Sequence, residues 1–263
     1  MLLVFNVQNS LISFGVYGED ILLNTWQVQT DIKKTSDQYA MLLNSLLSSY
    51  NIQNHMITDA VIASVVPDIM YTLQSTIIKL FSVKPVIIKA GIKTGINVKG
   101  DNPAQIGADR IVDAVAACRL YGVPNIVISL NTVITFGFID KKYNYYGAMI
   151  LPGVNLALKA LTENTAKLPD VKIIKADKII GKNTVENIQS GIYHGYLCMI
   201  EGLLTKIIKS NRLSVKSTHI TATGEYAPLI LNESRYDVNI DKDLSLKGLN
   251  IIYKLNGKYI RQI

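Results

Sequence analysis

Apolar residues recur at two different spacings along the 263-residue chain. Short apolar runs separated by turn residues predict buried strands, because strands are short and end where polar or flexible residues gather. Longer stretches in which apolar residues recur every three or four positions predict helices with one buried face. The predicted strands are residues 2–7, 11–16, 21–29, 60–65, 86–88, 126–130, 133–139, 146–151 and 218–222, and the predicted helices are residues 37–47, 67–80, 106–121, 154–162, 185–209 and 244–255.

The order of these elements occurs twice. A meander of three strands opens each half of the chain, and helices and strands alternate after it. A repeated order of elements indicates two similar units, each with its own core. We therefore predict an α/β fold of two domains, residues 1–120 and 121–263, with a cleft between them that holds the ligand.

Composition narrows the class of protein. Hydrophobic residues make up 49% of the chain, which is enough for a sizeable core, and no apolar run has the roughly 18 residues of a membrane span. The apolar N-terminus lacks the basic region of a secretory signal. Cys118 and Cys198 fall in apolar helical patterns, which indicates buried thiols rather than a disulfide or a metal pair. We expect a cytoplasmic protein with no membrane partner.

The net charge of +7 comes largely from scattered lysines. A basic balance favours anionic ligands or nucleic acid when the basic residues cluster with aromatic ones. No such cluster occurs, and the three histidines are too scattered for a zinc site. We expect lysines on a solvated surface and no nucleic-acid partner.

Two turns follow buried strands at matching places in the two halves. Gln8, Asn9 and Ser10 connect the first two strands, and Asn131 and Thr132 connect the first two strands of the second half. Backbone N–H groups and small hydroxyls in such a turn suit a phosphate group. Thr132 is equally consistent with an ordinary turn residue.

The segment Gly107, Ala108, Asp109 and Arg110 lies at the start of a predicted helix. Helix N-termini attract anions, and an arginine can bind a carboxylate with two parallel hydrogen bonds. The alternative is structural: the helix dipole stabilises an N-terminal Asp, and the neighbouring Arg lies at the surface. Further along, the hydroxyl of Thr184 is expected to cap the long helix that follows it.

Short motifs across nearly the whole chain resemble those of the type III pantothenate kinases, which belong to a superfamily with acetate kinase, sugar kinases and actin. Each motif alone is weak, but their order and spacing match. They are Ser64-Val65-Val66-Pro67, Asn102-Pro103, Gly107-Ala108-Asp109-Arg110, Thr132 with Thr135-Phe136, Gly147 through Pro152-Gly153, Leu168-Pro169, residues 180–184, Ser190-Gly191, Thr223-Gly224 and Gly248-Leu249.

This resemblance implies two ribonuclease-H-like domains and the phosphorylation of pantothenate by ATP to 4′-phosphopantothenate, the first step of coenzyme A biosynthesis. It also implies a homodimer that needs Mg²⁺ and a monovalent cation, potassium or ammonium (K or NH4). Its implied residue roles are Asp109 as the base that accepts the substrate's hydroxyl proton, Gly107, Ala108, Arg110 and Thr184 on pantothenate, with Thr184 reaching across the dimer, and Asn6, Val7, Gln8, Asn9, Ser10 and Thr132 at ATP.

The chain departs from the family pattern mainly on the nucleotide and cation side. Asn6 replaces an Asp, Gln8 replaces a Gly, and Ser129 replaces an Asp that binds the monovalent cation. A neutral amide holds Mg²⁺ less well than a carboxylate. We therefore expect either an impaired kinase or, alternatively, a catalytically inactive binding or regulatory protein on the same fold. The other replacements are Asn131 for Gly, Ile134 for Thr, Gly137 for Asp, Gly100 for Tyr and Glu225 for Gly.

Overall fold

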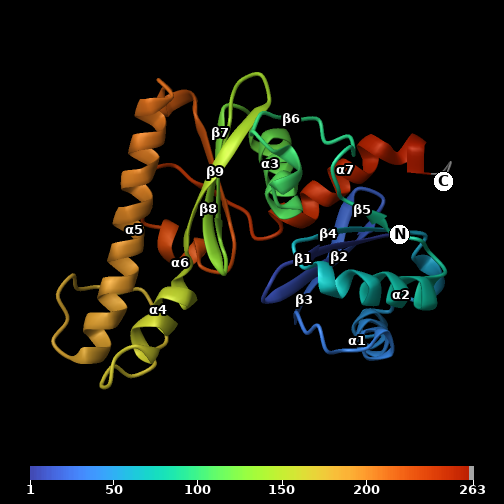
Figure 1. Cartoon of the computed structure of the whole chain (residues 1–263), viewed down its shortest axis with the longest axis horizontal. Helices are drawn as coiled ribbons and strands as arrows, with labels where there is room; N and C mark the ends of the chain where they lie inside the picture. The colour runs from blue at the N-terminus through green and yellow to red at the C-terminus, as the bar shows by residue number, and fades with distance from the viewer. Residues whose placement is uncertain (261–263) are drawn as a thin grey trace. The chain divides into compact units, whose positions relative to one another are not determined.

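The computed structural model describes residues 1–260 and divides the chain into two compact units. The first unit contains residues 1–116 and the C-terminal segment from residue 243, and the second contains residues 117–242 (Figure 1). Each unit has its own β-sheet and its own hydrophobic core. The mixed α/β class that the apolar pattern predicts is confirmed.

Five strands form the sheet of the first unit in the order β3-β2-β1-β4-β5. The central strand β1 runs antiparallel to β2 and parallel to β4. The connection from β3 to β4 carries helix α1, and α2 follows β4. The bounds are β1 Leu2–Val7, β2 Leu11–Gly18, β3 Ile21–Gln29, α1 Ser36–Ser48, β4 Asp59–Ser64, α2 Met70–Phe81 and β5 Val86–Ile87.

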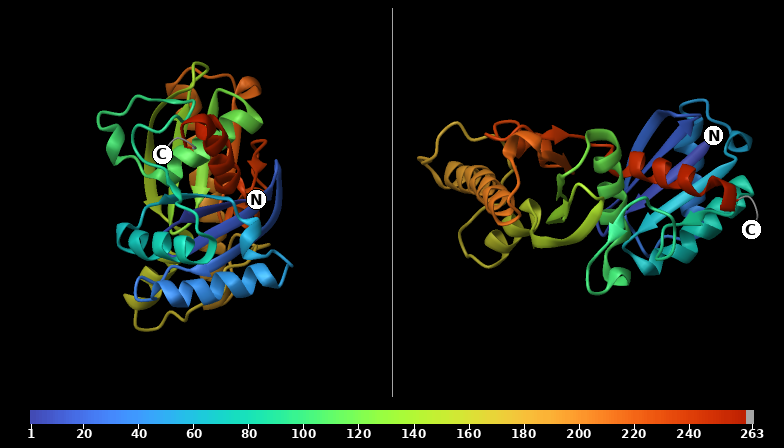
Figure 2. Two further views of the ribbon diagram at one scale, coloured as in Figure 1. Left: turned by 90° about the vertical axis from the view of Figure 1, so that its right-hand side faces the viewer. Right: turned by 90° about the horizontal axis from the view of Figure 1, so that it is seen from above.

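Helices cover both faces of this sheet. Side chains alternate along β1, so its apolar residues point to both faces. Leu3, Phe5 and Val7 lie in one cluster with the buried residues of α1 and α2. Leu2 and Val4 lie in a second cluster with residues of helices α3 (Ala108–Tyr121) and α7 (Leu244–Ile260). Figure 2 shows α7 on the side of the sheet opposite to α1 and α2. Strand β1 is therefore buried on both sides, as its continuous apolar run predicts.

Five strands of the second, six-stranded sheet repeat this order as β9-β8-β7-β10-β11. Helices α4, α5 and α6 lie on one side of it (Figure 1), and their apolar faces join the strands in one large cluster. The bounds are β7 Asn125–Leu130, β8 Val133–Ile139, β9 Asn144–Pro152, α4 Val154–Glu163, α5 Thr184–Ser210, β10 His219–Thr223, α6 Ala227–Leu231 and β11 Asn239–Ile240. The same strand order in both units explains the repeat seen in the sequence.

Helix α7 belongs to the first unit, whereas the sequence-based division between residues 120 and 121 placed it in the second. That division assigned the whole C-terminal segment to the second half, but α7 packs on the first sheet through Leu246, Leu249 and Ile252. Its apolar face is evident from the sequence, whereas the sheet that it covers is not, because a helix pattern contains no information on its packing partner. The shorter elements β6 (Asn97–Val98), β11 and α6 were not predicted.

Local signals predict some ends of the elements correctly. The Thr35 side chain accepts a hydrogen bond from the Gln38 backbone, and the Gln38 side chain accepts one from the Thr35 backbone, so α1 begins with a capping box.

Cys118 is buried as expected, but the expectation for Cys198 is wrong, because it lies on the exposed side of α5. Within residues 1–260, no helix combines the length and the apolar character that a membrane crossing requires.

Candidate active site

The N-terminus of α3 holds Asp109, the only carboxyl group among the predicted site residues, and its pKa is raised. The Arg110 backbone N–H donates to Asp109 Oδ1 at 2.8 Å, so the carboxylate folds back over the first turn of its own helix. A Cβ placed on Gly107 would lie 2.5 Å from Asp109 Oδ1 and 3.3 Å from a methyl group of Val65. Any side chain at position 107 would require the Asp109 carboxylate to move, so a glycine at this position favours the arrangement.

Burial raises the pKa of Asp109 above its ordinary value. The backbone hydrogen bond from Arg110 and the positive charge of Arg110 lower that pKa, but burial is the larger effect. A carboxylate with a raised pKa is a stronger proton acceptor than an ordinary surface Asp. Among the described residues predicted for the site, Asp109 is therefore the group best suited to act as a general base.

The first turn lies close to this helix start within the same unit. The Val65 backbone N–H donates to the Val7 carbonyl at 3.0 Å, and the Val65 side chain lies beside Gly107. Asn6 follows the alternation of Leu2 and Val4, so its side chain lies on the face of the sheet that α3 covers. Val65 thus connects the end of β1, just before the predicted nucleotide turn, with the Asp109 segment.

Asn6 has an unusual environment for a polar side chain. It is only 3% exposed, and among the described residues its Oδ1 has no hydrogen-bond partner. Buried polar atoms are almost always paired, so an unpaired one indicates a place where water or a ligand completes the contact. The backbone beyond it is fixed: Gln8 N donates to Leu11 O at 2.9 Å, and Thr30 Oγ1 donates to Gln8 O at 2.6 Å.

The second turn is closed by its own side chains. Asn131 Nδ2 donates to Ser129 Oγ at 2.9 Å, and Ser129 is only 9% exposed at the end of β7. Two glycines clasp the turn: a Cβ on Gly153 would lie 2.3 Å from the Asn131 carbonyl oxygen, and a Cβ on Gly224 would lie 2.4 Å from the Leu130 carbonyl oxygen. The polar side chains that replace a carboxylate and a glycine therefore satisfy each other.

Gly137, on the neighbouring strand β8, is covered by an aromatic ring. A Cβ on this glycine would lie 2.9 Å from the ring of Tyr145, which is buried. Ser129 pairs with Thr135 and Val127 pairs with Gly137, so Gly137 and Thr135 point to the same face of the sheet. The space that a side chain at position 137 would use is filled.

The Thr184 capping prediction is wrong. Asn183 is the N-cap of α5, because its side chain accepts a hydrogen bond from the Glu186 backbone at 2.9 Å. The Glu186 carboxylate in turn accepts from the Lys182 backbone N–H at 2.8 Å, and this hydrogen bond is the largest of the effects that lower the pKa of Glu186. Thr184 is the exposed first residue of the helix, in the second unit with Thr132.

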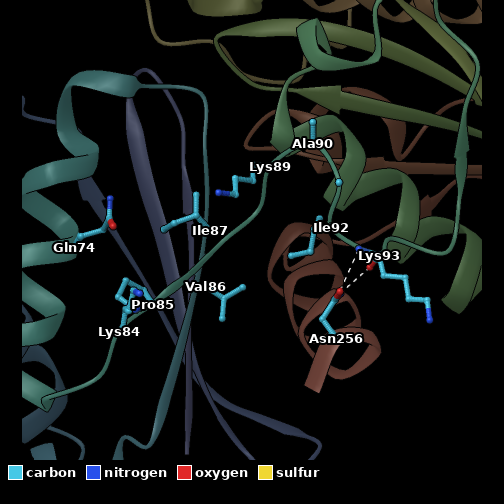
Figure 3. A pocket seen from close by; sticks show the side chains of 11 residues that line it. Gln74, Lys84, Pro85, Val86, Ile87, Lys89, Ala90, Ile92, Lys93 and Asn256 are labelled. Atoms are coloured by element: carbon cyan, nitrogen blue, oxygen red, sulfur yellow. Dashed lines mark hydrogen bonds between the residues drawn. The ribbon is translucent and has the colours of Figure 1, made fainter. Parts of the chain in front are cut away.

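A separate cavity of about 930 Å³ lies in the first unit. Figure 3 shows its wall, which runs from Gln74 on α2 through residues 84–93 to Asn256 on α7. Two hydrogen bonds tie that wall to α7: Lys93 N donates to Asn256 Oδ1 at 3.1 Å, and Asn256 Nδ2 donates to Lys93 O at 2.8 Å. None of the predicted site residues lines this cavity.

The donor set of the predicted turns contains no carboxylate. Within the described part of the chain, no three His, Cys, Asp or Glu side chains gather in a way that could hold a metal ion. The first turn offers the neutral oxygen of Asn6, and the second offers a hydroxyl that already accepts a hydrogen bond. These residues do not fit a divalent cation held tightly by the protein, because Mg²⁺ sites commonly include one or two carboxylates.

The repeated strand order defines the class of protein. Two ribonuclease-H-like units are the arrangement of the sugar-kinase and actin-like proteins. A solved structure from Campylobacter jejuni, assigned as a Baf family transcriptional activator, aligns with a TM-score of 0.60 at 17% identity and covers 97% of this chain and 99% of its own. A Sinorhizobium meliloti protein assigned as a 2-dehydro-3-deoxygalactonokinase aligns with a TM-score of 0.59 at 9% identity, covering 97% and 99%. These likenesses establish the fold.

Sequence similarity then establishes the family. The family model for type III pantothenate kinase matches residues 2–206. The type III pantothenate kinase of Agathobacter rectalis is 40% identical over 258 residues, which is 98% of each chain. That of Geobacillus kaustophilus is 40% identical over 256 residues, covering 97% of this chain and 98% of its own. The chain belongs to the type III pantothenate kinase family, as the motifs in its sequence predict.

Proposed function

We propose that this chain transfers a phosphoryl group from ATP to the hydroxyl of pantothenate, the entry step of coenzyme A biosynthesis, and that it does so slowly. The observation that carries this proposal is Asp109, a half-buried carboxylate with a raised pKa at a helix N-terminus. A base in this environment takes a proton from a hydroxyl more readily than a solvated Asp does.

The remaining residues of the α3 N-terminus recognise the substrate in this proposal. Pantothenate carries a carboxylate, and the guanidinium of Arg110 offers two parallel N–H donors to it. Gly107 and Ala108 bring backbone close to the substrate. When ATP is bound, its transferred phosphate supplies the electrophile, and the turns at residues 6–10 and at Thr132 offer N–H and hydroxyl donors to the phosphates.

Magnesium enters this proposal with ATP rather than with the protein. Asn6 presents a neutral oxygen where the family pattern has a carboxylate, and Gln8 adds a side chain where it has none. Phosphoryl transfer depends on positioning and on charge neutralisation, so the loss of a metal-binding carboxylate raises the barrier. Each tenfold loss of rate corresponds to about 1.4 kcal/mol.

A homodimer in the cytoplasm completes the proposal. Ile179 and Ile180 are 73% and 81% exposed, and Val185 is also exposed, so an apolar surface adjoins Thr184. Exposed apolar side chains mark interaction sites, and the family resemblance implies that Thr184 reaches the other subunit's pantothenate across such an interface. Light scattering at micromolar concentration tests this, and a monomer mass would refute the dimer.

A non-catalytic pantothenate-binding protein is the second candidate. The observation that favours it is the neutral, self-satisfied second turn, in which Asn131 and Ser129 bond to each other. Such a protein would keep the Asp109–Arg110 segment as a binding site and lack turnover.

One assay separates the two candidates. The chain is incubated with pantothenate, ATP and Mg²⁺, and 4′-phosphopantothenate is measured by mass spectrometry, with Asp109→Asn and the exposed control Asp170→Asn in parallel. We expect product from the native chain and the control, and a loss of about 10²–10⁴-fold in Asp109→Asn. Pantothenate-dependent thermal stabilisation without product would support the second candidate and refute the kinase.

A further inference from the structure

The hydrogen bond within the second turn takes no part in the proposed phosphoryl transfer. Asn131 Nδ2 donates to Ser129 Oγ at 2.9 Å, two residues earlier, at the buried end of β7. The family resemblance assigns a monovalent cation to a carboxylate at position 129. Here a hydroxyl takes the place of the carboxylate, and an amide N–H₂ group points at it.

The Asn131 side chain is held in this position from several directions. Its backbone N–H donates to Val133 O at 3.3 Å, and its carbonyl oxygen lies against Gly153. Its Oδ1 lies 2.8 Å from where a Cβ on Gly224 would stand. The amide therefore occupies the small space enclosed by the turn, Gly153 and Gly224.

The neighbouring position leaves no room for another ligand. The ring of the buried Tyr145 covers Gly137, on the face of β8 to which Thr135 also points. A carboxylate at position 137 would require that ring to move. The same face of the sheet thus has a hydroxyl, an amide and an aromatic ring where a cation site needs charged oxygens.

An ion would gain little at this place. Moving a cation from water to a buried site is costly unless anionic or several oriented oxygen ligands replace its hydration. The Ser129 oxygen already accepts a hydrogen bond, and the Asn131 amide presents its positive end to it. The N–H donor supplies the favourable dipole that a cation would otherwise supply, without a desolvated charge.

We infer that the Asn131 amide replaces a monovalent cation beside Ser129, so that this turn is ordered without potassium or ammonium. Asn131 is a positioning residue in this role, because it holds the turn that carries Thr132. The inference rests on the proposed function only for the identity of the ion. Its claim concerns ion binding, so it can be tested whether or not the chain turns over substrate.

The test is potassium-dependent thermal stability. The melting temperature is measured in potassium chloride and in choline chloride at equal ionic strength, for the native chain and for the double variant Ser129→Asp/Asn131→Gly. We expect no difference for the native chain. The double variant should gain about 3 °C when potassium is present at about ten times its dissociation constant.

A matched control exists elsewhere in the same unit. Asn211 Nδ2 donates to Ser210 Oγ at 3.2 Å at the exposed end of α5, so Ser210→Asp/Asn211→Gly introduces the same two residues away from the turn. We expect no potassium effect in this control. If the double variant at the turn does not fold, Asn131→Gly alone replaces it, with potassium binding read by isothermal titration.

Three results would overturn the inference. They are a potassium-specific rise in the native chain, an equal rise in the α5 control, and a turn variant that stays insensitive to potassium. The assay for 4′-phosphopantothenate is independent of all three, so failure of the kinase proposal and failure of this inference are distinguishable. If the native chain turns over, its rate should change by less than about twofold between potassium and choline, which is about 0.4 kcal/mol.

Discussion

The N-terminus of α3 and the turn after β7 are both predicted ligand sites, but they accommodate their polar side chains in opposite ways. At α3 a carboxylate, Asp109, lies half-buried beside a glycine, and partial burial raises its pKa. At the turn, Ser129 and Asn131 are neutral and bond to each other. The first region holds a carboxylate in an unfavourable environment, where it can accept a proton. The second region holds no charged side chain.

This contrast indicates which half of a two-substrate site is preserved. Polar groups that bond to one another stabilise a fold, and the atoms in that bond have less to offer a ligand. Groups held in an unfavourable state favour ligand binding or proton transfer, and such groups occur preferentially at functional sites. By this criterion we propose that the acceptor side of the reaction is intact and that the metal and cation side is reduced.

The largest expected effect is the loss of stability when a side chain replaces the hydrogen of Gly224, which packs against the second turn. Gly224 has φ +103°, and a Cβ there would lie 2.4 Å from the Leu130 carbonyl oxygen. Gly224→Ala should therefore lower the free energy of unfolding by about 3 kcal/mol, measured by urea denaturation. Gly195→Ala is the control, because nothing lies within 4 Å of its Cβ position on α5. Equal stability of Gly224→Ala and the native chain would contradict the clasp.

The next effect tests whether the first turn tolerates a charge. Asn6→Asp places a carboxylate in a buried site whose Oδ1 position has no partner among the described residues. We expect a loss of about 1–3 kcal/mol at neutral pH, because an unsatisfied buried charge is costly. Burial raises the pKa of such a carboxyl, so the loss should disappear as the pH falls below its unfolded value. Asn9→Asp, at an exposed position, should show no such pH dependence.

A third prediction concerns the stability that Asp109 gives up for function. Its pKa is raised in the folded state, so its contribution to stability is present below the ordinary value of 3.8 and is lost as the pH rises through the folded pKa. Asp109→Asn should therefore be more stable than the native chain at neutral pH, and the difference should vanish in acid. Thermal melts across pH measure this difference. A variant that is less stable than the native chain at neutral pH would contradict the raised pKa of Asp109.

The smallest effect isolates the bond inside the second turn. Ser129→Ala and Asn131→Ala should each cost about 1 kcal/mol, because each removes one side of the same hydrogen bond. The double variant should cost less than the sum of the two, and the double-mutant cycle measures the coupling. Strictly additive losses would show that the two side chains act independently.

The sequence predicts the elements better than their partners. Alternating apolar runs identify β1 and β2, and the repeat of strand meanders predicts two units, because these signals are local and periodic. The assignment of α7 depends on which sheet its leucines cover, which no local pattern contains. The position of Tyr145 over Gly137 depends on the register of the β8–β9 hairpin, which shifts between Gly137 and Ile139.

The candidate site was predictable to a similar extent. Asp109 and Arg110 are identifiable from their place at a helix start and from the family motifs. The cap of α5 was assigned to Thr184, although the Asn183-x-x-Glu186 pattern is a known N-terminal signature. The Ser129–Asn131 bond has a weaker signal, a polar pair two residues apart after a buried strand, and its pairing required the structure.

The most direct test of the account is the rate of 4′-phosphopantothenate formation by the native chain and by Asn6→Asp, measured side by side over a range of Mg²⁺ concentrations. The account attributes slow turnover to the missing carboxylate on a preserved acceptor site. It predicts measurable product from the native chain and an increase of about tenfold in Asn6→Asp, equivalent to about 1.4 kcal/mol. A native chain that is as fast as the variant at every Mg²⁺ concentration, or one that forms no product, would contradict it.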